Sequence, residues 1–295
     1  MGQIIVGIGE LLWDLLPGGK KLGGAPANFA YHARSLGNEG LVVSCLGDDT
    51  LGREMLGTLG RLSIAIDYLV VDKQFPTGTV AVRFGSDDVP SYEITENVAW
   101  DHIPFTPLLA GLAARADAVC FGSLAQRSEA SRHTIRSFLD AARADAVKIF
   151  DVNLRQHFYT KEVLQASLHL ATVLKVSEEE LPTLMRLLAH EGEGEVAARQ
   201  LAEEYNLEAV ALTLGARGSV IVSGSEISRH KGFPVKVVDT VGAGDSFTAA
   251  LAVGLLNGFS LDEVNEKANR LSSYVCGQAG GTPELPESIV RLFED

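Results

Sequence analysis

Short apolar runs alternate with longer amphipathic segments along most of the chain, and this alternation strongly limits the possible folds. Amphipathic segments such as residues 128–144 place Ile135, Phe138 and Leu139 at helical spacing. Continuous apolar runs rich in Val and Ile are typical of strands that are covered on both faces. The pattern predicts an α/β fold with a mainly parallel sheet between two layers of helices. The runs are IIVGIG from Ile4, LVVSCLG from Leu41, AVCFG from Ala118, KIFDVN from Lys148, TVLKVS from Thr172 and AVALTLG from Ala209.

One region interrupts this alternation. Between Ile66 and Trp100 the segments YLVV, TGTVAVRF and PSYEI predict short strands separated by turn residues. We expect a β insertion from about residues 11–20 and 66–100, which includes LLWDLL. Ligands of open α/β folds bind outside the carboxyl ends of strands, so a small sheet above those ends would form a lid. Its exposed edge could also pair with a second copy and form a homodimer.

Composition limits the function classes. A chain of 295 residues with 46% hydrophobic residues can form one large α/β core, so we expect a single domain over residues 1–295. The 38 acidic residues outnumber the 25 basic ones and give a formal charge of −13. A nucleic-acid or anionic-membrane surface is therefore disfavoured, and an anionic ligand must be held by local dipoles or by a cation.

The cysteines and the N-terminus indicate the compartment. Cys45, Cys120 and Cys276 lie far apart, which indicates neither a zinc site nor a disulfide framework. Glu10 and Asp14 interrupt the first apolar stretch, so no signal-peptide pattern forms. No run approaches the roughly 20 apolar residues that span a bilayer. We expect a cytoplasmic protein without a membrane partner.

The stretch VVDTVGAGDSFTAALAVGLL, from Val237, carries the strongest chemical signal. Its glycines permit a tight turn before an amphipathic helix, and unpaired N–H groups at a helix start attract anions. Gly242, Ala243 and Gly244 thus form a candidate anion cradle. Asp245 follows, where its carboxylate could accept a proton from a hydroxyl. The alternative is that Asp245 only caps the helix.

Two competing phosphate motifs are absent from the sequence. No GxxxxGK(S/T) P-loop occurs, and GIGELL after the first predicted strand lacks the third glycine of a dinucleotide fingerprint. The sequence therefore supports neither a P-loop fold nor a Rossmann dehydrogenase.

Polar residues elsewhere suggest a polyol site. In GGAPANFAYHARSLG, bare backbone at Gly23 and Gly24 would let a polyol approach, and Asn28 offers a donor and an acceptor. Helix–strand packing explains those glycines equally well. Asp14, among apolar neighbours, either faces solvent or binds hydroxyls.

The strand KIFDVNLR ends in polar residues. Asp151, Asn153 and Arg155 lie where a parallel strand delivers ligand groups. A structural salt bridge is the alternative for Arg155.

Both glycine-rich segments resemble the signatures of the ribokinase-like (PfkB) carbohydrate kinases, with GGAPAN as the first and DTVGAGD as the second. The resemblance extends over nearly the whole chain and implies a ribokinase-like three-layer sandwich with a small β lid. It implies that Gly242, Ala243 and Gly244 form the anion hole and that Asp245 is the base. Carried over in the same way, Gly24, Asn28 and Asp14 contact the sugar.

The same resemblance assigns further residues. Asn153 and Arg155 are expected near the phosphate or sugar. LKVSEEEL matches a segment whose Glu orients magnesium-bound water, here Glu180, with Ser177 in place of the usual Asn. An acidic first turn of a helix is the alternative for Glu180.

The nucleotide and a monovalent cation are also placed by resemblance. Thr213, Gly215 and Gly218 in ALTLGARGSVIV are expected close to the adenosine and phosphates, although a hairpin needs the same glycines. Asn269 is expected near the adenine. The loops around Asp239 and Gly280 are candidates for binding K⁺ through backbone carbonyls.

The implied activity is transfer of the ATP γ-phosphoryl group to a sugar hydroxyl with Mg²⁺. GELLWD, GGAPAN, FDVNLR and LKVSEEEL are similar to the fructokinase-like branch, so a ketohexose is the expected substrate. Ribokinase is disfavoured because Ala25 replaces a Lys of its first signature. Adenosine or 2-keto-3-deoxygluconate kinases remain alternatives, the latter with Arg83 or Lys21 as the cation, and so does a sugar-binding protein without phosphoryl transfer.

Overall fold

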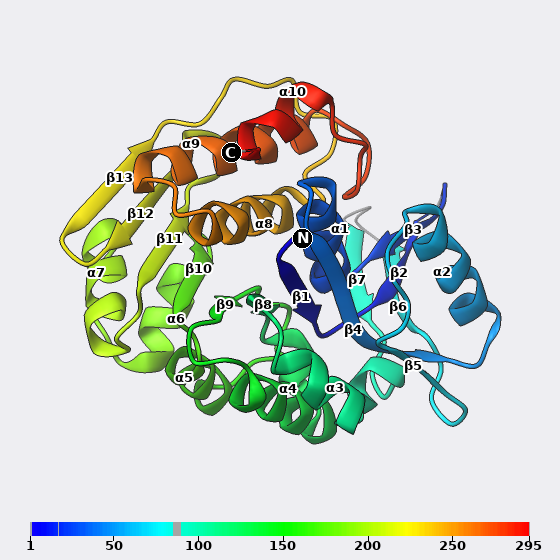
Figure 1. The fold of residues 1–295 in the computed structure, drawn as a ribbon. Coiled ribbons are helices and arrows are strands. Elements are labelled where there is room, and N and C mark those ends of the chain that lie inside the picture. Colours follow the sequence, from blue (N-terminus) through cyan, green and yellow to red (C-terminus); the bar gives the residue numbers. More distant parts are fainter. Residues whose placement is uncertain (1, 17, 85–89, 295) are drawn as a thin grey trace.

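Two sheets organise the chain (Figure 1). The computed structural model describes residues 2–16, 18–84 and 90–294, and within them nine strands form a large sheet and four form a small one. The large sheet has the order β13-β12-β11-β10-β9-β8-β1-β4-β5. Its strands are β1 (Ile4–Ile8), β4 (Glu39–Gly47), β5 (Leu69–Asp72), β8 (Ala118–Phe121), β9 (Val147–Asp151), β10 (Val173–Ser177), β11 (Ala209–Thr213), β12 (Ser219–Ser223) and β13 (Glu226–His230).

Strand direction confirms the predicted mainly parallel sheet. From β11 to β5 each neighbouring pair is parallel, for example Val6 opposite Val119 and Val173 opposite Ala209. Only the edge strands β12 and β13 pair antiparallel among the described strands of this sheet. The carboxyl ends of β1, β8, β9, β10 and β11 consequently lie along one edge.

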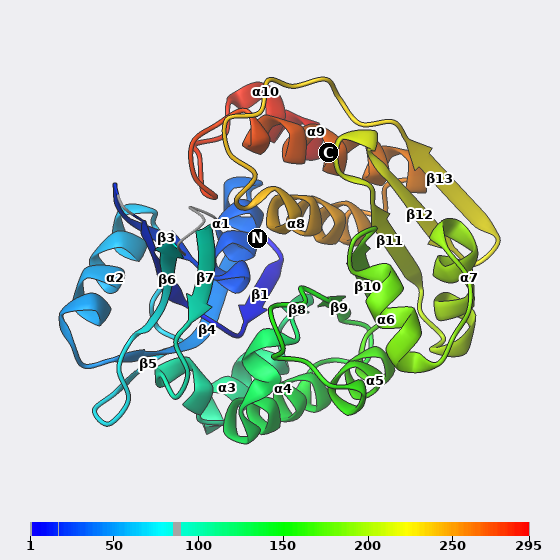
Figure 2. The same ribbon diagram turned by 180° about the vertical axis from the view of Figure 1, so that it is seen from behind.

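Helices cover both faces of the large sheet, as Figures 1 and 2 show. Side chains of one strand alternate between the two layers, so Ile5 packs with α1 and α8 residues while Val6 and Ile8 pack on the opposite side. One layer contains α1 (Ala25–Ser35), α2 (Thr50–Arg61), α8 (Ala243–Leu256), α9 (Leu261–Cys276) and α10 (Glu287–Val290); the other contains α3 (Pro107–Ala113), α4 (Glu129–Ala141), α5 (Lys161–Leu170), α6 (Leu181–Leu188) and α7 (Gly194–Glu204).

The small sheet has the order β3-β2-β6-β7 and lies at one end of the sandwich (Figure 1). Its strands are β2 (Leu12–Leu16), β3 (Gly19–Gly23), β6 (Gly78–Phe84) and β7 (Pro90–Ile94). Leu12, Val80 and Ile94 are buried in the same cluster as the main core. The small sheet is therefore packed onto the large one through its inner face.

One strand of the expected insertion was misplaced. The segment YLVV does form a strand, but this strand, β5, pairs in parallel with β4 at the edge of the large sheet. The local pattern predicts a strand without specifying its partner, and that explains the error. The turn at residues 85–89 and the Arg83 side chain lie outside the described part of the structure.

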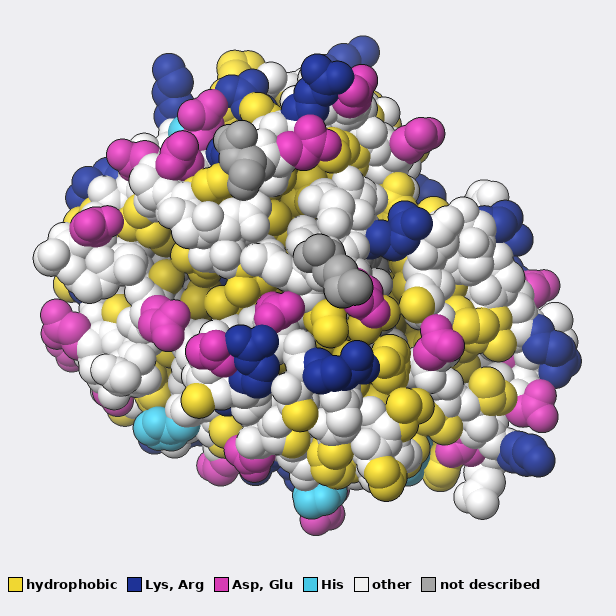
Figure 3. All heavy atoms as spheres, viewed as in Figure 1, with side chains coloured by type: hydrophobic (Ala, Val, Ile, Leu, Met, Phe, Trp, Pro, Cys, Tyr) yellow, Lys and Arg dark blue, Asp and Glu magenta, His cyan; other side chains and the backbone are white. Residues whose placement is uncertain are grey.

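The surface carries both acidic and basic side chains. Acidic and basic side chains are interspersed over the face seen in Figure 3. Within the described residues, no helix combines the length and the apolar character that a membrane crossing requires. The three cysteines are free thiols.

Helix α1 lies so close to the large sheet that two strand positions admit only glycine. A Cβ atom at Gly7 would lie 2.2 Å from the carbonyl oxygen of Pro26, and one at Gly40 would lie 2.0 Å from that of Ala30. Real Cβ atoms do not approach backbone oxygens this closely. The position of α1, which carries Asn28, is thus fixed by backbone contact with β1 and β4.

We predict that Gly40→Ala lowers the free energy of unfolding by about 1–3 kcal/mol, because α1 must move away from β4. The matched control is Gly57→Ala in α2, where the nearest atom to the new Cβ is 3.8 Å away on the Arg61 side chain. There a stabilisation of about 0.5–1 kcal/mol is expected. Urea unfolding followed by circular dichroism measures both, and equal effects would contradict the close-contact argument.

Candidate active site

A cavity of about 720 Å³ lies between the small sheet and the carboxyl edge of the large sheet. It brings together eight of the residues predicted from the sequence, and they come from segments far apart in the chain. These are Asp14, Gly24, Asn28, Asn153, Arg155, Asp239, Gly242 and Asp245. Glu10, Leu12, Leu16, Lys21, Gly23, Ala25, Val80, Ile94, Leu124, Gln156 and Val241 complete the lining within the described residues.

Asp245 lies in the first turn of α8, at the inner end of the cavity. The helix begins after Gly242, which is its N-cap residue, so the alternative that Asp245 caps the helix is wrong. Its Oδ2 atom accepts a hydrogen bond from Asn28 Nδ2 at 2.8 Å. Asn28 is only 3% exposed, and α1 packs against α8. The first glycine-rich segment therefore serves to place an amide beside this carboxylate.

The surroundings of Asp245 favour its protonated form more than water does. Burial raises the pKa of Asp245 to about 6, and the nearby charge of Asp151 adds to this rise. The hydrogen bond from Asn28 and the positive charges of Lys175 and Arg155 oppose it. A carboxyl group with a pKa near 6 is suited to exchange protons near neutral pH.

The backbone before Asp245 has the shape of an anion cradle. Gly242 has φ 76°, and a Cβ there would lie 2.5 Å from Gly281 Cα, so only glycine fits. Among the described residues, no side chain caps α8. The N–H of Ala243 makes a long 3.3 Å hydrogen bond to Thr240 O. The first turn of α8 therefore keeps N–H groups that a side chain does not cap, which is compatible with the predicted anion cradle.

One side of the cavity is formed by β2, β3 and the start of α1. A Cβ at Gly23 would lie 2.6 Å from Asp14 Oδ2, and one at Gly24 would lie 2.5 Å from Glu10 O. Bare backbone therefore leaves room for the Asp14 carboxylate at Gly23 and for the main-chain carbonyl of Glu10 at Gly24. Burial raises the pKa of Asp14, and the charges of Arg155 and Lys21 lower it.

Glu10 was missed as a site residue by the sequence reasoning, although it lines the cavity. It is 4% exposed, and its Oε1 accepts a hydrogen bond from Ala25 N at the start of α1. Burial raises the pKa of Glu10 to about 7, against the hydrogen bonds from the backbone. The available signal was an acidic residue directly after a buried strand.

The loop after β9 turns its polar residues toward the cavity. Asn153 adopts a left-handed conformation with φ 46°, and Leu154 N donates to Glu180 Oε1 at 2.9 Å. The Arg155 guanidinium donates to Leu154 O and forms no salt bridge with another described residue, so the salt-bridge alternative is not supported. The Asn153 conformation and the Glu180 contact set the direction in which Arg155 leaves the strand.

Glu180 and Ser177 form one unit at the start of α6. Glu180 Oε2 accepts hydrogen bonds from the backbone N–H of Ser177 at 3.0 Å and from its hydroxyl at 2.9 Å. A carboxylate offers about four acceptor positions, so it retains capacity for a water molecule. Among the described residues, no group of three or more His, Cys, Asp or Glu side chains could hold a metal directly.

Asp239 connects three segments at the mouth of the cavity. Its Oδ2 accepts hydrogen bonds from Gly280 N at 3.1 Å and from Lys21 Nζ at 3.0 Å, and its Oδ1 accepts one from Val241 N at 3.1 Å. Burial acts to raise the pKa of Asp239, but these hydrogen bonds lower it overall. The two loops proposed to hold K⁺ are thus in contact, and Lys21 ties β3 to them.

Apart from Asn153, the residues assigned to the nucleotide lie outside this cavity. Ser177 and Thr213 pair across β10 and β11 at the same sheet edge. Gly215 begins the 3-10 turn Gly215–Arg217 between β11 and β12, and Gly218 follows it. Asn269 is 5% exposed and donates to Ser219 Oγ and to Asn265. Its side chain is therefore engaged inside the protein.

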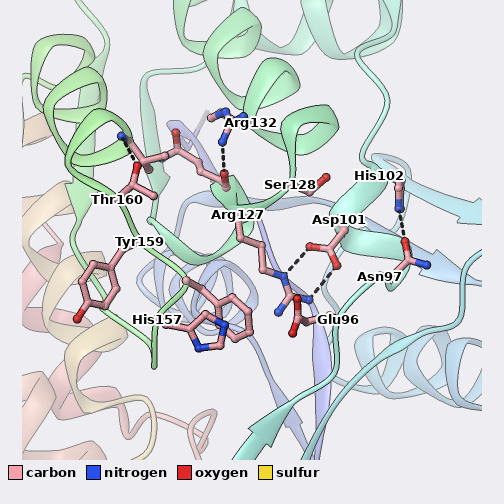
Figure 4. A pocket seen from close by; sticks show the side chains of 13 residues that line it. Glu96, Asn97, Asp101, His102, Arg127, Ser128, Arg132, His157, Tyr159 and Thr160 are labelled. Carbon is pink, nitrogen blue, oxygen red and sulfur yellow. Dashed lines mark hydrogen bonds and ion pairs between the residues drawn. The ribbon is translucent and has the colours of Figure 1, made fainter.

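A second cavity, of about 410 Å³, is shown in Figure 4 and contains none of the predicted residues. Arg127 crosses it and forms a two-pronged ion pair with Asp101, at 2.8 Å from each carboxylate oxygen. The guanidinium also lies between the rings of Trp100 and Phe158, 4.0 and 4.6 Å from their centroids. Because this cation is already matched, the first cavity is the better candidate site.

An anion cradle, a carboxyl group with a raised pKa and a cavity lined with polar side chains are the features that an ATP-dependent sugar kinase, a phosphotransferase that acts on a sugar hydroxyl, requires. Comparison with known proteins agrees with this class. The chain belongs to the pfkB family of carbohydrate kinases, whose family model matches residues 18–288.

Individual relatives cover almost the whole chain. A fructokinase of Escherichia coli is 30% identical over 95% of this chain and 95% of its own length. The uncharacterized sugar kinase PH1459 of Pyrococcus horikoshii is 29% identical over 97% of this chain and 94% of its own. Its crystal structure in complex with ATP has a TM-score of 0.84 over 98% of this chain and 100% of that one. A fructokinase structure from Xylella fastidiosa, 21% identical over 99% and 98%, shares the fold with a TM-score of 0.82.

We predict that Asp245→Asn stabilises the protein at high pH. The pKa of Asp245 is raised to about 6 from 3.8, so wild-type stability falls as pH rises through this range. Asparagine carries no charge and therefore removes the cost of ionising this carboxyl group in the folded protein. That cost is about 1–3 kcal/mol above pH 7, because the side chain is only partly buried. Urea unfolding at pH 4.5 and 8 tests this, and a difference between variant and wild type that does not grow with pH would contradict it.

Proposed function

We propose that this enzyme phosphorylates a neutral ketohexose of the fructose type, with Asp245 as the catalytic base. The observation that carries the proposal is the position of the Asp245 carboxylate. It lies where the anion cradle meets the cavity proposed to bind the sugar, and it accepts a hydrogen bond from Asn28. The similarity to the Escherichia coli fructokinase supports the substrate class.

The proposed reaction is an in-line displacement. The sugar O–H proton passes to the Asp245 carboxylate while the hydroxyl oxygen forms a bond to the γ-phosphorus of ATP. The bond between that phosphorus and the bridging oxygen breaks, and ADP leaves with the electron pair. Amides of Gly242, Ala243 and Gly244 would stabilise the charge that develops on the transferring group.

On the nucleotide side we assign Asn153, Ser177, Thr213, Gly215 and Gly218 to ATP, and leave out Asn269 because its amide is bonded to Ser219 and Asn265 inside the protein. The exposed side chains of Val235, Val237, Val238 and Val241 support a base site nearby, since they form apolar surface in the segment that leads to the cradle. The ATP complex of PH1459, a structure 28% identical to this chain, supports ATP as the donor.

Magnesium, when bound, would neutralise part of the negative charge of the phosphates. Glu180 is proposed to hold it through water, using acceptor positions that Ser177 and Leu154 leave free. A monovalent cation is proposed between the loops at Asp239 and Gly280, whose contact supports a shared site.

On the acceptor side we assign Asp14, Gly24, Asn28 and Arg155 to the sugar. Four carboxylates (Glu10, Asp14, Asp239, Asp245) and two cations (Lys21, Arg155) line the described cavity. Lys21 is already paired with Asp239, so an acidic sugar would meet more negative than positive charge. This balance favours a neutral sugar over 2-keto-3-deoxygluconate. Arg155 lines the same cavity and could bind a carboxylate, so 2-keto-3-deoxygluconate remains the second candidate substrate.

We predict that Asp245→Asn lowers kcat by about 10²- to 10⁴-fold, because only the base is lost. The dissociation constant of ATP, measured by calorimetry with Mg²⁺ present, should stay within about threefold, because the cradle amides are unchanged. Wild-type turnover in this variant would exclude Asp245 as the base.

A coupled ADP-release screen tests the substrate class. Fructose, ribose, 2-keto-3-deoxygluconate, fructose 6-phosphate and adenosine are compared by kcat/KM. We expect fructose to exceed both anionic sugars by at least about tenfold, which corresponds to roughly 1.4 kcal/mol of charge discrimination. A preference for the acid would transfer the assignment to the second candidate, with Arg155→Gln as the matched variant that should abolish that preference.

A further inference from the structure

Lys175 is a buried lysine that the proposed reaction does not use. It lies in the middle of β10, within an apolar run, and its side chain is 9% exposed. An ammonium group is costly to remove from water unless it is paired and hydrogen-bonded. Asp151, at the end of the neighbouring strand β9, accepts a hydrogen bond from Lys175 Nζ at 3.0 Å through Oδ1.

The Asp151 carboxylate extends this contact to the catalytic helix. Thr248 Oγ1 lies 2.9 Å from Asp151 Oδ2 and 2.9 Å from the carbonyl oxygen of Gly244. Thr248 is completely buried, and Asp151 is 4% exposed. A continuous series of polar contacts thus joins β9 and β10 to the first turn of α8.

The ammonium group also touches the cradle itself. A Cβ atom at Gly244 would lie 3.1 Å from Lys175 Nζ, so the cation lies directly beneath the residue before Asp245. The start of a helix is already positive, which makes this an unfavourable place for a cation by itself. Asp151 offsets the positive charge of Lys175 when no anion is bound. An anion bound at the cradle would offset that charge further.

We propose that Lys175, held by Asp151, is a positioning residue for phosphoryl transfer. It fixes the first turn of α8 against the sheet and supplies a permanent positive charge behind the cradle and beside Asp245. This inference rests on the proposed role of Asp245 as base. A purely structural brace would stabilise the fold without affecting proton transfer.

The two members of the pair act on Asp245 in opposite directions. Lys175 lowers the pKa of Asp245 and Asp151 raises it. Other charged or titratable groups act on this side of α8, and neither substitution below changes them; they are Glu10 after β1, Arg155 after β9, Cys120 in β8 and Glu180 before α6. Removing the lysine should therefore raise the pKa of the base, and removing the aspartate should lower it.

The test compares Lys175→Met with Asp151→Asn in the complete enzyme, using kcat/KM for the best sugar between pH 4.5 and 8.5. We expect the midpoint of the acid limb to rise by about 0.5–1 pH unit in the first variant and to fall by a similar amount in the second. We also expect kcat of Lys175→Met to fall at least about tenfold with little change in the KM of the sugar, as for an interaction made mainly in the transition state.

The double variant Lys175→Met/Asp151→Asn guards against misfolding, because it leaves no unpaired buried charge. Its midpoint should return toward wild type while kcat stays low. The matched control is Asp101→Asn, which breaks the equally buried ion pair with Arg127 away from α8. It should lower the unfolding temperature without moving the midpoint.

Two outcomes would overturn the inference: midpoints that shift in the same direction or not at all, and full turnover in the double variant. If Asp245→Asn is inactive in either case, the proposed function stands and only the role of Lys175 falls. If Asp245→Asn keeps wild-type turnover, the proposed base fails and the inference fails with it.

Discussion

Parallel pairing in the large sheet is the constraint on which the rest of the molecule depends. Because the strands from β11 to β5 run in one direction, their carboxyl ends meet at one edge. Glu10 follows one of these ends, Asn153 follows another, and Ser177 terminates a third. Helix α8 starts at the same edge, where it brings Asp245 to the polar groups that the strands deliver. A chemical site assembled from distant segments is thus a consequence of strand direction.

Much of this arrangement could be predicted from the sequence, for a physical reason. Strands covered on both faces require continuous apolar runs, so each polar residue or glycine at the end of a run needs an explanation. Asp245 was singled out by the glycine cradle before it, and the resemblance to the kinase signatures added Asp14, Gly24 and Asn28; the structure places all four in one cavity. The β insertion was found by the same logic, because its short strands break the helical spacing.

What the sequence did not reveal depends on contacts between distant elements. The strand at Leu69–Asp72 has the local pattern of the insertion but pairs with β4. Glu10 looked like an interruption of an apolar stretch, and Lys175 was hidden inside one. Their contacts are visible only in the folded protein, where Glu10 meets the start of α1 and Lys175 lies beside Gly244 of α8. The side chain of Asn269 likewise turns to Ser219, fifty residues away in the chain, a partner that spacing could not suggest.

The contact between Gly242 and Gly281 has a consequence for engineering and divergence. A side chain at position 242 would collide with the backbone at 281, and one at 244 would meet Lys175, so the cradle tolerates almost no variation. The walls proposed to hold the acceptor, in contrast, also present side chains to the cavity, among them Asp14 of β2, Lys21 of β3 and Arg155 after β9. New sugar specificities can therefore arise by changing the walls while the phosphoryl-transfer chemistry is inherited unchanged.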